Sequence, residues 1–162
     1  VWVSNWAGNS LSLFNSKGRA LSPSSGFTQG DPIKPQGMAV GRDGSLWIAN
    51  SRTDYVTLYR GSDPRRWAKI AGKGISNSFS VALDARGDAW VTNESLTAAP
   101  GSVTRITREG TADLEVTGGG LSSPLGVAVD RGANTGVADF DANTLTPLPP
   151  AATAARAPRI RR

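Results

Sequence analysis

The feature that most constrains the fold of this chain is an internal repeat with a period of about 45 residues. Four short segments each end in Asn or Asp, and three of them carry a tryptophan at their second position. The equivalent positions 2, 47, 90 and 136 are separated by 45, 43 and 46 residues. The four segments are residues 1–5, 46–50, 89–93 and 135–139.

More of each unit recurs than this one segment. A short apolar stretch precedes it, at residues 37–40, 80–83 and 126–129, and a polar turn such as residues 84–88 joins the two. An alternating stretch follows it, at residues 10–14, 55–59, 102–106 and 144–148, and weaker segments lie at 67–71 and 112–117. Alternating β-branched and aromatic residues bounded by Gly, Asp and Asn predict short strands joined by tight turns.

A period near 45 residues with about four strands in each unit is typical of a β-propeller blade. We therefore predict an all-β fold of about three to four four-stranded blades, over residues 1–146. The expected blade units are about 1–34, 35–77, 78–123 and 124–146. Because propeller rings close with about four to eight blades, we expect this chain to be a fragment of a propeller.

Two stretches resemble a known family. Residues 35–50 read Pro-Gln-Gly-Met-Ala-Val-Gly-Arg-Asp-Gly-Ser-Leu-Trp-Ile-Ala-Asn, and residues 124–130 read Pro-Leu-Gly-Val-Ala-Val-Asp. They resemble NHL-repeat propellers and, more broadly, the bacterial streptogramin-lyase-like (virginiamycin B lyase-like) group. The resemblance implies a seven-bladed ring that opens a macrolactone by elimination, with a divalent cation and with histidine and glutamate on the propeller face.

The composition conflicts with the activity that this resemblance implies. The chain contains no histidine and no cysteine, which excludes a Ser-His-Asp triad, a thiol nucleophile and the usual zinc sites. Gln36 and Leu125 stand where the family places histidine in a Pro-His-Gly turn. We assign no catalytic residue and leave the metal unknown, with a divalent cation implied by the resemblance alone.

The expected function is therefore that of a non-enzymatic NHL-type module that binds a protein or small ligand through rim loops. The alternative is a fragment of a metal-assisted, streptogramin-lyase-like or lactonase-like enzyme whose catalytic residues lie outside this chain. We expect the protein to act outside the cytoplasm. No run of apolar residues is long enough to span a bilayer.

The candidate ligand-binding residues lie on one rim of the expected propeller. Asn5, Asn50, Asn93 and Asp139 end equivalent strands, and Glu94 opens the loop after the third of them. Their oxygens are of the type that binds a hard cation such as calcium. The other interpretation is that each side chain accepts hydrogen bonds from the turn that follows it.

The recurring tryptophans also allow two interpretations. An exposed indole is a stacking platform for sugars or bases, whereas a buried one in every blade would wedge neighbouring blades together. We favour the packing role for Trp2, Trp47 and Trp90. Asp84 and Asp130, which end the preceding strand of two units, are predicted turn formers.

The net charge of +5 is concentrated at the C-terminus. Four of the 18 basic residues lie in the last seven positions, so residues 1–155 carry 14 basic and 13 acidic side chains, a net charge of +1. Residues 147–162 are expected to be a disordered tail rich in Pro, Ala and Arg. Three explanations are a basic extension that binds a polyanion, a marginal helix over residues 151–156, and an out-of-frame translation of GC-rich coding DNA, of which we favour the last. Nucleic acid is an expected partner only through the tail arginines, which are Arg156, Arg159, Arg161 and Arg162.

Overall fold

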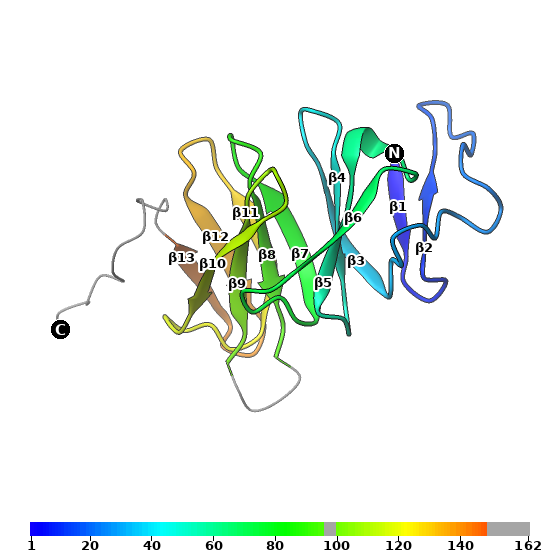
Figure 1. The fold of residues 1–162 in the computed structure, drawn as a ribbon. Coiled ribbons are helices and arrows are strands. Elements are labelled where there is room, and N and C mark those ends of the chain that lie inside the picture. The colour runs from blue at the N-terminus through cyan, green and yellow to red at the C-terminus, as the bar shows by residue number, and fades with distance from the viewer. Residues whose placement is uncertain (96–99, 149–162) are drawn as a thin grey trace, which may run out of the picture.

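The computed structural model describes residues 1–95 and 100–148, which form thirteen β-strands and one short 3-10 helix, η1 (Arg60–Ser62). The strands build four antiparallel sheets that follow one another along the chain, each lying beside the next (Figure 1). We number these sheets as blades 1 to 4. The tail arginines and residues 96–99 lie outside the described residues.

The strand bounds follow the predicted repeat closely. Blade 1 contains β1 (Trp2–Asn5) and β2 (Ser10–Leu13). Blade 2 contains β3 (Pro35–Val40), β4 (Leu46–Asn50), β5 (Tyr55–Tyr59) and β6 (Trp67–Ala71). Blade 3 contains β7 (Ser78–Leu83), β8 (Ala89–Asn93), β9 (Ser102–Ile106) and β10 (Ala112–Thr117). Blade 4 contains β11 (Pro124–Val129), β12 (Thr135–Asp139) and β13 (Thr144–Leu148).

The first strands of blades 2, 3 and 4 lie beside one another, since β3 and β11 both contact β7. These three strands are the inner strands, on the side of the array where the axis of a propeller would lie. The strands of blades 2 and 3 then pair in chain order, outward to β6 and β10. All-antiparallel pairing places the turns that follow the inner strands at one end and the Asn- or Asp-terminated strand ends at the other.

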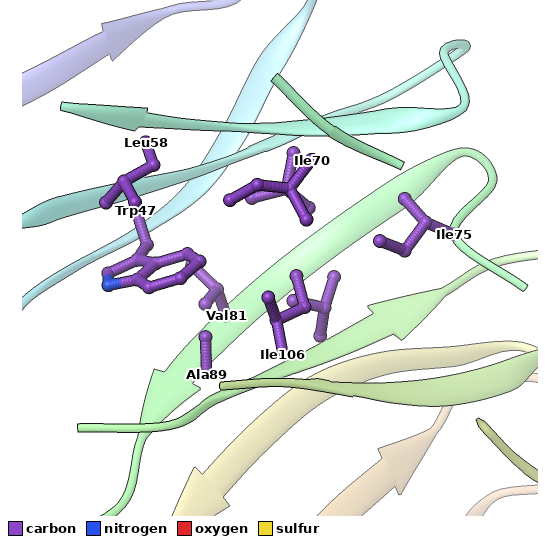
Figure 2. Close-up of a cluster of buried hydrophobic side chains, with 9 residues drawn as sticks. Trp47, Leu58, Ile70, Ile75, Val81, Ala89 and Ile106 are labelled. Atoms are coloured by element: carbon purple, nitrogen blue, oxygen red, sulfur yellow. The ribbon is translucent and has the colours of Figure 1, made fainter. Parts of the chain in front are cut away.

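The hydrophobic core consists of three clusters, and each cluster lies between two successive blades. The cluster between blades 2 and 3 contains Trp47 and Leu58 from one blade and Val81 and Ala89 from the other (Figure 2). Trp90 lies in the cluster between blades 3 and 4. Both indoles are 2% exposed. Trp2 packs against the cluster between blades 1 and 2, so all three tryptophans have the packing role predicted for them.

Blade 4 departs from the repeat at two positions, yet its strands form. Gly136 takes the place of the tryptophan and is exposed, with no atom within 4 Å of the position that a Cβ would occupy. Pro147 pairs with Gly136 inside β13, which ends at Leu148, two residues beyond the predicted end of the repeat. A proline is tolerated there because β13 is the edge strand of its sheet in the described part of the chain.

Within the described residues, 1–95 and 100–148, no helix is long and apolar enough to cross a membrane.

Candidate functional site

The predicted rim residues lie at equivalent strand ends, and their side chains are used inside the fold. Asn50 and Asn93 are buried, at 0% and 3% exposure, and Asp139 is 4% exposed. Asn93 Nδ2 donates hydrogen bonds to Ser102 Oγ at 3.1 Å and Thr104 Oγ1 at 2.9 Å on the neighbouring strand. Its Oδ1 accepts from the Ser78 hydroxyl at 3.2 Å.

The other two asparagines make the same cross-strand contact. Asn50 Nδ2 donates to Thr57 Oγ1 at 3.0 Å, and Asn5 Nδ2 donates to Ser12 Oγ at 2.9 Å. Thr57 in turn donates to the Gly30 carbonyl at 3.0 Å, in the linker that leads into blade 2. We call this arrangement, in which a strand-end amide joins a hydroxyl of the next strand, the strand-end network.

Asp139 fixes the linker that leads into its blade by a different set of bonds. Its carboxylate accepts hydrogen bonds from the backbone N–H groups of Ser122 at 2.6 Å, Ser123 at 3.1 Å and Ala142 at 3.1 Å. Burial opposes the ionised form, but these three donors outweigh it and hold the pKa of Asp139 below its ordinary value of 3.8. The predicted turn contact is present here, through Ala142.

Glu94 lies where the loops of blades 2 and 3 meet. Its Oε2 accepts a hydrogen bond from Asn77 Nδ2 at 3.1 Å, and its N–H donates to the Asn77 carbonyl at 3.3 Å. Asn77 Oδ1 accepts from the Arg52 N–H at 2.7 Å. These contacts link consecutive blades, and ligand binding by Glu94 and the other rim residues stays a prediction.

The donor set on this rim does not fit the divalent cation that the family resemblance implies. Both oxygens of Asp139 and the Oδ1 of Asn93 accept hydrogen bonds from the protein, so their lone pairs face donors. Asn50 Oδ1 is buried without a partner, but one amide oxygen is far fewer than the about six to eight oxygen ligands that calcium takes. Among the described residues, no three acidic side chains gather closely enough to bind a metal ion. We derive no chemistry through a metal.

A cleft of about 450 Å³ lies at the opposite end of the blades. The turns β3–β4, β7–β8 and β11–β12 border it, because the three inner strands lie side by side and end there. We call it the inner-turn cleft. It is lined by Val40, Gly41, Arg42, Asp43, Trp47, Leu83, Asp84, Ala85, Arg86, Gly87, Arg108, Val129, Asp130 and Arg131.

The aspartates of the cleft form its turns. Asp84 Oδ1 accepts from the N–H groups of Arg86 at 2.8 Å and Asp88 at 3.1 Å, and Asp130 Oδ1 accepts from Gly132 and Asn134, both at 2.8 Å. The bonds from the Asn134 side chain and backbone hold the pKa of Asp130 below its usual value. Asp84 and Asp130 are thus turn formers, as predicted.

Asp43 plays the same part in blade 2, where Gly41 replaces the strand-end aspartate. The Ser45 backbone N–H donates to Asp43 Oδ1 at 2.9 Å and the Ser45 hydroxyl donates to Oδ2 at 2.8 Å. The bonds from Ser45 lower the pKa of Asp43. In all three turns, therefore, the negative charge faces donors of its own turn.

The arginines of these turns have no such partners. Arg42, Arg86 and Arg131 are exposed, and no ion pair or side-chain hydrogen bond involves their guanidinium groups in the described part of the chain. Arg108, which also lines the cleft, instead pairs with Glu109 at 2.7 Å. The cleft thus combines an apolar floor with three arginine side chains that form no ion pair in the described part of the chain.

Comparison with known proteins identifies the fold. No family model matches the chain, and no curated protein matches it in sequence. Its structure is similar to that of virginiamycin B lyase from Staphylococcus aureus, with 15% identity and a TM-score of 0.59, over 91% of this chain and 50% of that one. A gluconolactonase from Xanthomonas campestris is 17% identical, with a TM-score of 0.54, over 86% of this chain and 55% of that one.

A third similar structure is PorZ, a bacterial surface component of the type-IX secretion system of Porphyromonas gingivalis. It is 18% identical with a TM-score of 0.62, over 85% of this chain and 22% of that one. At these identities the likeness shows the fold alone. The chain has the β-propeller fold, as a partial propeller, and spans about half the length of the lyase.

Proposed function

We propose that this chain is a ligand-binding, non-enzymatic part of an NHL-type β-propeller, and that the ligand sits in the inner-turn cleft. The convergence of three inner-strand turns on one cleft carries the proposal. A cleft of about 450 Å³ falls within the range of about 300–1,000 Å³ typical of small-molecule sites. Rim loops on a rigid β scaffold are also where binding residues usually lie.

The rim at the other end supports binding less well. Asn5 Nδ2, both side-chain polar atoms of Asn93 and both carboxylate oxygens of Asp139 are engaged within the fold, so a ligand of these atoms would have to displace existing hydrogen bonds. Breaking such bonds in buried groups costs about 1–3 kcal/mol each. At the inner-turn cleft, the guanidinium groups of Arg42, Arg86 and Arg131 have no ion pair or hydrogen bond to break within the described part of the chain.

Methyl NMR spectroscopy tests the proposal directly. The chain is titrated with a set of single-ring probes, namely 2-phenylethanol, phenylacetate and phenyl phosphate, and we expect saturable shifts at the methyl groups of Val40, Leu83 and Val129. Ala85→Trp fills the cleft and should abolish these shifts. Ala20→Trp places the same side chain at an exposed position outside the cleft and should leave them intact.

Two results would contradict the proposal. The first is the absence of saturable shifts with any of the three probes. The second is a pattern of shifts confined to the exposed apolar residues of blades 1 and 4, such as Val3 and Leu145, and insensitive to Ala85→Trp. That pattern would mean that the probes adsorb to apolar surface without a site.

An enzymatic function is the second candidate, and the likeness to a lyase and a gluconolactonase favours it. Under this proposal the chain contributes blades to a ring whose catalytic residues lie elsewhere. Because those residues would lie outside this chain, the complete ring to which its blades belong is assayed for opening of a simple lactone, with and without added Mg²⁺ and Ca²⁺. No turnover above buffer is expected, and metal-dependent turnover would overturn the non-enzymatic proposal.

We propose an extracytoplasmic location on the strength of the likeness to PorZ, which is a surface component. Fractionation of bacterial cells that express the tagged protein from its own gene checks this. We expect the protein in the envelope or medium, and recovery from the cytosol alone would contradict the proposal.

A further inference from the structure

The ligand class of the inner-turn cleft can be taken further, in an inference that rests on the function proposed above. The starting point is that three blades each deliver one arginine to the same place. Arg42 and Arg131 are the second residues of their turns and Arg86 is the third. Because β3, β7 and β11 lie side by side, the three turns that follow them lie together and all border the cleft.

Two arginines elsewhere in the described structure are paired with a carboxylate. Arg105 forms two hydrogen bonds to the Asp113 carboxylate, at 3.0 and 2.8 Å, and Arg65 is paired with Asp63 at 3.1 Å. Among the described residues, Arg42, Arg86 and Arg131 have no carboxylate partner, although acids lie in the same turns. Guanidinium groups bind planar or tetrahedral oxyanions through paired N–H donors, so an anion would supply the missing partner.

The acids of the cleft do not cancel this preference. Asp84 accepts three protein donors, from Arg86 N, Asp88 N and Trp90 Nε1. Asp43 and Asp130 accept donors of their own turns in the same way. Counting all lining side chains, four arginines face three aspartates, so the lining carries a net formal charge of +1.

The floor of the cleft requires a second property of the ligand. Val40 is 58% exposed at the end of its inner strand, and the side chains of Leu83 and Val129, which hold the equivalent place in the next two blades, are partly exposed beside it. Trp47 lies beneath them. Covering apolar area gains about 25 cal/mol per Å², so a ligand with an apolar body binds better here than a bare inorganic ion.

We propose that the inner-turn cleft binds a small molecule that carries a carboxylate or phosphate group on an apolar ring or chain. The anionic group lies among Arg42, Arg86 and Arg131, and the apolar part covers the floor. The volume of the cleft suits a molecule of this size and is too small for a folded partner.

The test compares anionic and neutral probes of one shape on the full chain. Phenylacetate and phenyl phosphate are the anions, 2-phenylethanol is the neutral counterpart, and inorganic phosphate is the anion without an apolar body. Dissociation constants come from methyl NMR titrations at low and moderate salt. We expect both aromatic anions to bind more tightly than either reference, and to weaken as salt rises because the arginines are exposed.

Charge-removing variants identify the groups that act. Arg42→Gln, Arg86→Gln and Arg131→Gln should each weaken the aromatic anions by about three- to tenfold and leave 2-phenylethanol within about twofold. Arg19→Gln is the matched control, because Arg19 is also exposed but lies outside the cleft. It should change nothing beyond the small effect of net charge.

The pH profile separates the two anion chemistries. The chain has no histidine, and the charged side chains that line the cleft are all Arg or Asp, so a change in affinity between pH 5.5 and 8 reports the ligand itself. Phenyl phosphate gains its second charge near pH 6 and should bind more tightly above it, whereas phenylacetate should give a flat profile. The probe that binds more tightly at pH 8 and loses more on arginine removal identifies the ligand class.

The two levels of proposal fail in different ways. If 2-phenylethanol binds as tightly as the anions, and the three arginine variants behave as Arg19→Gln does, the anionic class is wrong and the binding cleft stands. If no probe gives saturable shifts at the cleft methyl groups, the binding function proposed above is wrong as well. A loss confined to the anions in the cleft variants confirms the inference.

Discussion

Replacement of Trp47 by alanine tests the idea that the recurring tryptophans hold successive blades together. Trp47 is 2% exposed and lies against Val81 and Ala89 of the next blade (Figure 2). An indole buries about 150–250 Å², which at about 25 cal/mol per Å² corresponds to about 4–6 kcal/mol. Truncations of large aromatic core residues cost about 3–5 kcal/mol, so we expect a loss of about 4 kcal/mol.

The assay must separate local loosening from global unfolding, because each blade contacts only its neighbours. Urea denaturation followed by far-UV circular dichroism gives the change in the free energy of unfolding. Hydrogen exchange then shows where protection falls. We expect the loss of protection at β4, β7 and β8, which meet at the Trp47 contact, to exceed that at β12.

Trp67 provides the matched control. It is 49% exposed on the outer strand of the same blade, and its replacement by alanine should cost about 1–2 kcal/mol, since part of its area is already in water. If Trp47→Ala costs less than about 1 kcal/mol, or no more than Trp67→Ala, the wedge interpretation is wrong.

Three further predictions concern the rim and blade 4. Asp139→Asn should lower the free energy of unfolding by about 2 kcal/mol at pH 7. Because the folded-state pKa of Asp139 is depressed below 3.8, the ionised carboxylate stabilises the fold above that pH. Urea titrations should show the difference in stability between the wild type and the variant closing as the pH falls through the folded-state pKa. Asn93→Ala should destabilise more than Asn50→Ala by about 1 kcal/mol in the same assay, because Asn50 Oδ1 has no partner to lose; equal losses would contradict this. Gly136→Ala should raise the thermal midpoint and add about 0.5–1 kcal/mol to the free energy of unfolding, because a Cβ at this position meets no other atom. Gly101→Ala is the control and should lower the midpoint, because a Cβ there would lie 2.7 Å from a backbone oxygen.

Strand positions could be predicted from the sequence almost residue by residue. The alternating pattern and the recurring tryptophans allow the repeat units to be aligned with one another. The weak segments at 67–71 and 112–117 could therefore be placed as outer strands, where β6 and β10 lie. Blade 4 was harder, since Gly136 and Pro147 break the pattern. Its strands form because β11 packs on β7 and supplies the context that the local residues lack.

The strand-end network was only partly predictable. The asparagines were singled out because they recur, but the expected partner was the following turn. A second recurring signal identifies the actual partner: the third residue of the next strand is Ser12, Thr57 or Thr104, a hydroxyl residue in each blade. Pairing two recurring polar positions across a predicted hairpin would have found this contact.

The arginines of the inner-turn cleft carry no comparable signal in the sequence. Arg86 is one place out of register with Arg42 and Arg131, so aligning the units does not bring the three together. Only the packing of the inner strands does so. A residue that recurs in register performs a task that every blade needs, such as packing or closing a turn. These arginines lie together in space although they do not occupy the same position in each unit, so they perform no such task in the individual blade. That is why we look for the ligand of this propeller among the arginines of the inner turns.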